Sequence, residues 1–421
     1  MRFKISIVSI QRIARRVFFM AGVYASSASA SDWPQFLGPT RDGAYSGGNL
    51  AKQWPKNGPP VLWKKDVGQG FSGPIVADGK VILFHRVGAQ ERVECFDAEK
   101  GGSLWRFDYP TAYEDTFGFD EGPRGTPAIA DGKVFTFGAE GALHCLDFAT
   151  GKKVWSVDAK KQFKTAKGFF GIACSPLVEG NAVLLNLGGE NGAGVAAFDR
   201  ATGKLLWKAT DDEAGYASPT AATLNGQRLA LFFTRSGLVA CEPASGKTVF
   251  QFPWRARMSA SVNAATPLVI DDLIFLSASY NAGAALLRVK GASVEKLWSG
   301  DDILSNHYVT SVHRNGFLYG FDGRQEQGER LRCVELKTGK VRWSQEDLAA
   351  GTVTLAGDLL LVLTERGELI EVAAAPEAFK EVNRAQILSS GVRAYPALAN
   401  GRLFARSKDK LVCVNLAGGA K

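Results

Sequence analysis

The chain has 421 residues, of which 46% are hydrophobic, and 50 basic against 42 acidic residues give it a formal net charge of +8. The apolar fraction is that of a globular protein. Five of the basic residues lie in the first 30 positions, and the remaining 45 nearly balance the acidic residues. The rest of the chain is nearly neutral, so its charge gives no support to nucleic-acid binding.

Residues 1–30 have the pattern of an export signal. Basic residues between positions 2 and 16 precede the apolar stretch 17–25, and Ala28-Ser29-Ala30 offers a small-x-small cleavage site. The apolar stretch is too short to span a bilayer, and no later segment could cross one. We expect cleavage after Ala30 and a soluble, periplasmic or otherwise extracytoplasmic protein. The pair Arg15-Arg16 leaves both the twin-arginine and the general export route open.

Residues 31–59 are predicted to form an N-terminal extension, and residues 60–421 a single repeat domain. Within the repeat domain, an acidic residue is followed eight positions later by a large aromatic residue. The copies are Asp97 with Trp105, Asp147 with Trp155, Asp199 with Trp207, Glu242 with Phe250, and Glu335 with Trp343. Spacing this regular indicates that one supersecondary unit has been copied along the chain.

Each unit opens with a short strand after a step such as Ser-Pro or Thr-Pro. Eight openings fall 41 to 53 residues apart, at Pro74, Pro127, Pro176, Pro219, Pro267, Ser311, Thr352 and Pro396. Units of this length with about four short strands are typical of β-propeller blades. The eighth unit ends near Asn415 without an outermost strand, and residues 60–65 have the pattern of the missing one. We predict an all-β, eight-bladed β-propeller, closed by an N-terminal strand that completes the last blade.

The repeated tryptophans are predicted to be structural. An indole on the outermost strand is large enough to fill the gap between blades, and its N–H can reach a backbone carbonyl. The predicted docking residues are Trp63, Trp105, Trp155, Trp207, Trp298 and Trp343. Phe250 keeps the bulk but lacks the donor. The fifth unit has lost the Thr-Gly turn but keeps Trp298, and the seventh has lost both.

The six cysteines are predicted to be buried and unpaired. Four of them, Cys95, Cys145, Cys333 and Cys413, occupy the same position of different units, where Ala197 stands in another copy. Cysteine then acts as a small apolar residue. Equivalent positions of different blades lie too far apart for a disulfide.

The phrase Ala-Phe-Asp-Arg-Ala-Thr-Gly-Lys-Leu-Leu-Trp at residues 197–207 resembles the tryptophan-docking motif of the pyrroloquinoline-quinone-like β-propeller repeat family. The opening Asp32–Gly43, with Gly122–Pro127 and Asn306–Tyr308, is similar to exported members without an assigned activity. The resemblance covers essentially all of residues 31–421. It implies the fold but leaves the function open, because quinoprotein alcohol dehydrogenases, assembly factors of the BamB type and uncharacterised proteins share the scaffold.

The resemblance implies that a dehydrogenase of this family would hold the quinone and a Ca²⁺ ion on the propeller axis, beside two adjacent cysteines. This chain has no adjacent cysteine pair and no Cys-x-x-Cys-His motif, and Glu190-Asn191 is the one pair that could offer calcium ligands. The four histidines, His85, His144, His307 and His313, lack metal-ligand spacing. We therefore predict no catalytic residue, no metal and no cofactor. The alternative is a diverged PQQ-dependent oxidoreductase that uses PQQ with Ca²⁺.

Residues just before each inner strand of a propeller face the central funnel. The polar and aromatic residues there are Ser72, Arg124, Ser175, Tyr216, Asn263, His307, Tyr308, Arg393 and Tyr395. Two arginines with several hydroxyls suit a small polar or anionic ligand. Alternatively, these groups satisfy one another and nearby loop carbonyls.

Aromatic residues in the loops between units offer a second type of surface: Phe117, Phe119, Phe163, Phe169, Phe170 and Trp254. They form either an exposed rim for a partner protein or a cluster packed onto the blades. The sequence thus favours a non-catalytic periplasmic binding or scaffold protein, monomeric, with an unidentified protein partner or small ligand. A BamB-like assembly factor is the second alternative, although no cysteine follows the signal to carry a lipid.

Overall fold

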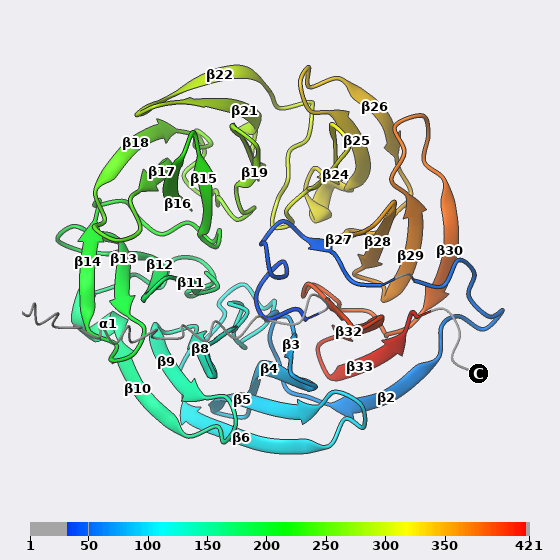
Figure 1. Ribbon diagram of the computed structural model, residues 1–421, viewed down its shortest axis with the longest axis horizontal. Helices are drawn as coiled ribbons and strands as arrows, with labels where there is room; N and C mark the ends of the chain where they lie inside the picture. Colours follow the sequence, from blue (N-terminus) through cyan, green and yellow to red (C-terminus); the bar gives the residue numbers. More distant parts are fainter. Residues whose placement is uncertain (1–31, 49, 418–421) are drawn as a thin grey trace, which may run out of the picture.

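The computed structural model describes residues 32–48 and 50–417. The predicted fold is confirmed, because eight sheets form a ring around a central axis (Figure 1). In blades 1 to 7 four consecutive strands pair antiparallel in sequence order, from the axis to the rim. The predicted signal at residues 1–30 lies outside the described residues.

Seven blades are built from consecutive strands. Blade 1 holds β3 (Ile75–Ala77), β4 (Lys80–Val87), β5 (Gln90–Asp97) and β6 (Ser103–Pro110). Blade 2 holds β7 (Ala128–Ala130), β8 (Lys133–Phe137), β9 (Ala142–Asp147) and β10 (Lys153–Asp158). Blade 3 holds β11 (Leu177–Glu179), β12 (Ala182–Gly189), β13 (Ala193–Asp199) and β14 (Leu205–Ala209). Blade 4 holds β15 (Thr220–Leu224), β16 (Gln227–Phe233), β17 (Gly237–Cys241) and β18 (Thr248–Pro253).

Blade 5 holds β19 (Leu268–Ile270), β20 (Leu273–Ala278), β21 (Gly283–Lys290) and β22 (Ser293–Gly300). Blade 6 holds β23 (Val312–Arg314), β24 (Phe317–Asp322), β25 (Arg330–Glu335) and β26 (Val341–Gln345). Blade 7 holds β27 (Gly351–Ala356), β28 (Leu359–Thr364), β29 (Glu368–Ala373) and β30 (Glu381–Gln386). The short helices α1 (Ala159–Phe163) and η1 (Gln325–Gln327) lie in loops.

Blade 8 closes the ring as predicted. It combines the C-terminal strands β31 (Ala397–Ala399), β32 (Arg402–Arg406) and β33 (Lys410–Asn415) with the N-terminal strand β2 (Val61–Asp66). Trp63 pairs with Cys413, which is the register that the other blades use for their tryptophans. Chain ends far apart in sequence therefore share one sheet, and the ring has no open junction between its first and last blades.

The six tryptophans join neighbouring blades. Each indole N–H donates to a backbone carbonyl of the next blade: Trp63 to Ala98 (3.1 Å), Trp105 to Phe148 (3.1 Å), Trp155 to Arg200 (3.0 Å), Trp207 to Pro243 (2.8 Å), Trp298 to Leu336 (2.8 Å) and Trp343 to Ala375 (2.9 Å). The ring packs on the turn glycine. At Gly203 (φ +73°) a Cβ would lie 2.6 Å from the Trp155 ring, so the motif requires glycine both for its backbone and for space.

Blades 4 and 7 lack the docking tryptophan and carry other side chains at its position. At the junction of blades 4 and 5, Phe250 has no donor, and the Asn225 side-chain amide donates to the Val289 carbonyl at 2.8 Å instead. In blade 7, Asn383 stands at the tryptophan position, opposite Glu371. Its amide donates to the Glu371 carboxylate, and its oxygen accepts the Trp54 backbone N–H at 3.3 Å.

The six cysteines are all buried and free. Cys95, Cys145, Cys333 and Cys413 each lie opposite the docking tryptophan of their blade. Burial raises the pKa of the Cys413 thiol to about 12, so the group stays protonated and apolar at neutral pH.

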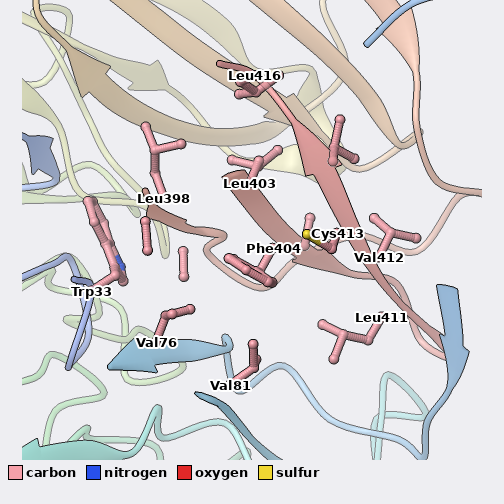
Figure 2. Packing of buried hydrophobic residues seen from close by; sticks show 14 of the residues in the cluster. Trp33, Val76, Val81, Leu398, Leu403, Phe404, Leu411, Val412, Cys413 and Leu416 are labelled. Carbon is pink, nitrogen blue, oxygen red and sulfur yellow. The ribbon is translucent and has the colours of Figure 1, made fainter. Parts of the chain in front are cut away.

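Residues 32–45 cross the centre of the ring, where Figure 1 shows them in blue. The Trp33 backbone exchanges two hydrogen bonds with Val76 of β3, both 2.9 Å. Its indole packs in a core shared with blade 8, beside Leu398 (Figure 2). At the other end β1 (Ala44–Tyr45) pairs parallel with β27 of blade 7. This segment, which we call the axial segment, therefore ties distant blades to one another. Within the described ranges, no helix is long and apolar enough to cross a membrane.

Replacement of Trp207 by Phe should remove one interblade hydrogen bond while keeping most of the packing. The Pro243 carbonyl would lose its partner, and we expect the free energy of unfolding to fall by about 1–3 kcal/mol. Denaturant-induced unfolding followed by circular dichroism measures the change. Leu206 is a neighbouring exposed residue, and the free energy of unfolding of Leu206→Ala should stay within about 0.5 kcal/mol of that of the parent. Equal losses in the two variants would contradict the docking role of the indole N–H.

Candidate binding site on the propeller axis

A cavity of about 360 Å³ opens on the axis. The loops that lead from an outer strand to the next inner strand converge there and supply most of its walls, while Phe36 of the axial segment lines it from within the ring. The lining residues are Phe36, Phe71, Phe117, Phe119, Arg124, Thr126, Phe169, Phe170, Ala173, Ser175, Tyr216, Ser218, Ala260, Val262, Ala264, Tyr280, His307, Tyr308, Arg324, Gln325, Glu326, Arg393 and Tyr395. Aromatic side chains dominate this lining.

Phenylalanines from two loops form one wall of the cavity. The ring of Phe117 lies 5.1 Å from Phe170 and 6.1 Å from Phe169, and Phe119 lies 5.9 Å from Phe170. The Tyr216 hydroxyl accepts the backbone N–H groups of Phe169 and Phe170, at 2.7 and 3.1 Å. The wall is thus held in place by hydrogen bonds as well as by ring contacts, although Phe117 remains 54% exposed.

The two predicted arginines have their charges compensated. Arg124 contacts the Asp115 carboxylate at 3.1 Å, and Arg393 contacts Glu365 at 2.9 Å. Both guanidinium groups also lie over the Phe71 ring, 5.4 and 5.6 Å from its centroid. The cavity therefore presents stacked arginine planes and aromatic faces, which suit an apolar or aromatic ligand.

His307 is fixed between two polar neighbours. Its Nε2 lies 2.8 Å from the Tyr280 hydroxyl, and its Nδ1 lies 2.6 Å from the Gln325 side-chain oxygen. Burial lowers the pKa of His307, so the imidazole is neutral at pH 7. In this arrangement the histidine orients a tyrosine and a glutamine at the cavity wall.

A belt of hydroxyl groups surrounds the deep end of the cavity. The hydroxyl of Thr126 in blade 2 accepts the Gly73 N–H of blade 1 at 3.1 Å. Ser175 in turn accepts the Thr126 N–H, and Ser218 accepts the Ser175 N–H, both at 2.9 Å. On the opposite side Thr310 accepts from Thr266 at 2.9 Å. The hydroxyls thus join the inner ends of consecutive blades, as the tryptophans join their rims.

Arg41 of the axial segment lies next to this belt. Its guanidinium donates to the carbonyls of Pro219, at 2.7 Å, and of Pro176, and its Nε donates to the Gln35 side chain at 2.9 Å. The side chain is 3% exposed. Burial lowers the pKa of Arg41 to about 9, which leaves the group protonated at neutral pH.

Glu329 is a second buried titratable group, close enough to Glu326 and Arg393 of the cavity lining for their charges to affect it. It is 6% exposed, and neither carboxylate oxygen has a hydrogen-bond partner within the described part of the chain. Burial, with the nearby charges of Glu365 and Glu326, raises the pKa of Glu329 to about 8 against the opposing effect of Arg393. Asp322 acts in the same direction as the other acidic residues. The carboxyl group is therefore mostly protonated at pH 7.

The structure brings together most of the predicted funnel residues: Arg124, Ser175, Tyr216, His307, Tyr308, Arg393 and Tyr395 line the cavity. Ser72 and Asn263 are not among the lining residues. Ser72 is fully buried, and the Asn263 amide donates to the Thr234 and Trp254 carbonyls at 2.9 and 3.0 Å. A ligand-binding role for these two and for the others stays a prediction.

Sequence reasoning missed Phe36 and Arg41, because both precede the first repeat and no periodicity points to them. It also missed Phe71, Tyr280 and Arg324, which come from loops without a shared motif. The six loop aromatic residues, five phenylalanines and Trp254, were expected only as an exposed rim or as packing against the blades. Four of the six instead line the cavity: Phe117, Phe119, Phe169 and Phe170.

The residues present do not fit the alternative cofactor pair, PQQ with Ca²⁺. Glu190 and Asn191 lie on the exposed turn between β12 and β13, where Glu190 contacts Lys164 at 3.3 Å. In residues 32–48 and 50–417 no group of three or more His, Cys, Asp or Glu side chains is placed to hold a metal ion. The aromatic walls could contact a planar quinone, but the oxygen ligands for calcium are not assembled beside them.

Comparisons with known proteins place this architecture in a family. A sequence model described as outer membrane protein assembly factor BamB matches residues 89–345 and 327–419. The BamB of Shewanella oneidensis is 24% identical over 383 residues, which cover 85% of this chain and 89% of that protein. The quinohemoprotein alcohol dehydrogenase ADH-IIG of Pseudomonas putida is 33% identical over 153 residues, or 35% of this chain.

The chain spans a fifth of that dehydrogenase, since the match covers 20% of its length. Among solved structures, quinohemoprotein alcohol dehydrogenase from Comamonas testosteroni superposes with a TM-score of 0.67 at 15% identity. The superposition covers 94% of this chain and 82% of that one. At this identity the likeness shows the fold alone.

Glu329 should make the stability of the protein depend on pH. A carboxyl with a raised folded pKa contributes stability that is present below the unfolded value of 4.5 and is lost as the pH rises toward about 8. The side chain of Glu329→Gln cannot lose a proton. The difference in free energy of unfolding between this variant and the parent should therefore shift by about 3 kcal/mol in favour of the variant when the pH is raised from 4.5 to 7.5. Unfolding at the two pH values measures the difference. The exposed Glu346→Gln is the control, and an equal pH response of parent and Glu329→Gln would contradict the account.

Proposed function

The chain belongs to the family described as outer membrane protein assembly factor BamB, and on that premise we propose that it is a non-catalytic, extracytoplasmic protein that binds an aromatic small molecule in the axial cavity. The observation that carries the proposal is the lining of the cavity, which is already formed and in which Phe and Tyr make up ten of 23 residues. The export signal expected at residues 1–30 supports the extracytoplasmic location.

The chemistry of the lining supports binding over catalysis. Arg124 and Arg393 are compensated by carboxylates, and His307 is neutral between Tyr280 and Gln325. These groups can orient a ligand and shield it from water. A preformed aromatic cavity also avoids most of the entropy lost when loops become ordered on binding. A two-ring ligand with about 12 heavy atoms, at roughly 0.5 kcal/mol per atom, would then bind with a dissociation constant of tens of micromolar.

A protein-docking role is a second candidate, favoured by the end-to-end match to the Shewanella protein. Phe117 and Met258 are 54% and 51% exposed in loops that also line the cavity. Site-specific photo-crosslinking in cells from position 117, with exposed position 201 as control, tests this candidate. A partner captured from position 117 and not from 201 would favour docking, and no difference between the positions would count against it.

The alternative oxidoreductase makes a different prediction. A titration with pyrroloquinoline quinone and Ca²⁺ should give no calcium-dependent saturable binding at tens of micromolar, because calcium ligands are not assembled at the cavity. Dye reduction with simple alcohols should equal that of a protein-free control. Saturable binding with turnover would replace the present proposal with a quinoprotein activity.

Filling the cavity should abolish ligand binding. Ala264 lines the cavity, and Ala264→Trp would place an indole in the space that the ligand needs. We expect 2-naphthalenemethanol to bind the parent in calorimetry, and the variant to bind it at least about tenfold more weakly. Ala201→Trp, on an exposed turn, is the matched control. Circular dichroism establishes that both variants are folded. Absent binding to the parent, or equal binding to both variants, would contradict the proposal.

A further inference from the structure

The deep end of the cavity is rich in hydrogen-bond donors. The hydroxyl oxygens of Thr126, Ser175 and Ser218 each accept a backbone N–H from the preceding or neighbouring blade. Over residues 32–48 and 50–417, none of the three hydroxyl hydrogens has an acceptor. A hydroxyl has one hydrogen to donate, and all three residues line the cavity, so these hydrogens are available to a ligand.

Arg41 places a buried positive charge behind Ser175 and Ser218, although its side chain is not itself part of the cavity lining. Its guanidinium is bound to the carbonyls of Pro176 and Pro219, which follow Ser175 and Ser218 in the chain. Within the described residues, no carboxylate lies within ion-pairing distance of it. A buried charge is normally paired with an opposite charge, because removing it from water costs free energy and neutral neighbours offset little of that cost.

The three arginines that line the cavity do not share this property. Arg124, Arg324 and Arg393 have Asp115, Glu326 and Glu365 as partners, so their fields are largely cancelled nearby. Arg41 is instead surrounded by carbonyl oxygens, and its charge acts over a short distance through a dry, low-dielectric interior. We therefore expect Arg41 to contribute a positive potential at the deep end of the cavity, while the charges of the lining arginines are balanced by their partners.

We propose that the deep end of the cavity is an anion site, formed by the hydroxyls of Thr126, Ser175 and Ser218 above Arg41, and that it takes the carboxylate of an aromatic acid. The ring system of such a ligand lies between the phenylalanine wall and the arginine planes. This inference rests on the proposed binding function and specifies its ligand class. It also gives the axial segment a role in recognition, because Arg41 comes from that segment.

Two probes with the same ring system test the inference. Calorimetry compares 2-naphthoate with the neutral 2-naphthalenemethanol on the purified protein at pH 7. We expect the acid to bind at least about tenfold more tightly, since a unit charge several ångströms from a buried guanidinium is strongly attracted. In Arg41→Gln, which keeps amide donors but removes the charge, the affinity ratio should fall to about 1–3. Arg228→Gln, whose arginine pairs with Glu179 away from the cavity, should keep the parental ratio.

Because Arg41 is buried, a second variant tests the same site without it. Ser175→Ala combined with Ser218→Ala removes two of the hydroxyl donors, and thermal unfolding establishes that the protein is folded. The ratio of the affinities for 2-naphthoate and 2-naphthalenemethanol should fall in this variant as well, while the affinity for the neutral probe changes little. Equal binding of the two probes to the parent would overturn the anion site but leave the aromatic cavity as a binding site. Binding of neither probe would overturn both, and an unchanged ratio in both variants would place the anion elsewhere.

Discussion

The structure depends on one kind of interblade hydrogen bond, in which a blade donates to the blade that follows it. At the rim the donor is an indole N–H and the acceptor a turn carbonyl, as between Trp207 and Pro243. At the axis the donor is a backbone N–H and the acceptor a hydroxyl, as between Thr126 and Ser175. Since every blade needs a following blade, the last one requires β2 from the N-terminal part of the chain, which brings Trp63 to blade 1.

The donors in the cavity are a consequence of the hydrogen bonds that join the inner ends of the blades. A serine or threonine that accepts an amide still has its own hydrogen to donate, so the belt that holds the blades leaves donors facing inward. The axial segment occupies the centre of the ring and is fixed to blades 1 and 7 by backbone pairing. Phe36 adds one more aromatic ring to the cavity lining, and Arg41 adds a buried charge that no carboxylate of the described residues pairs with. A scaffold of eightfold repetition thereby acquires one asymmetric site.

Much of the fold could be predicted because it is built from one repeated unit. The eight-residue spacing identifies the blades, and the strand around Trp63, which precedes the first unit, predicts how the ring closes. The site was less accessible. Position before an inner strand located Arg124, Tyr308 and their neighbours correctly, but spacing cannot show that Arg124 meets Asp115 in the same loop. The expected polar cavity is therefore mostly aromatic. Spacing also cannot show that the Asn263 amide donates to the Thr234 and Trp254 carbonyls, because an amide can bond loop carbonyls as readily as a ligand.

The central claim, that an aromatic acid binds on the axis with its carboxylate at the deep end, is tested most directly by anomalous diffraction. Crystals of the protein soaked with 6-bromo-2-naphthoate would locate the bromine, and the electron density would locate the carboxylate. The account predicts a bromine peak beside the phenylalanine wall and the carboxylate against Ser175 and Ser218, above Arg41. Bromine peaks found only outside the cavity, or a ligand with its carboxylate toward the cavity mouth, would contradict it.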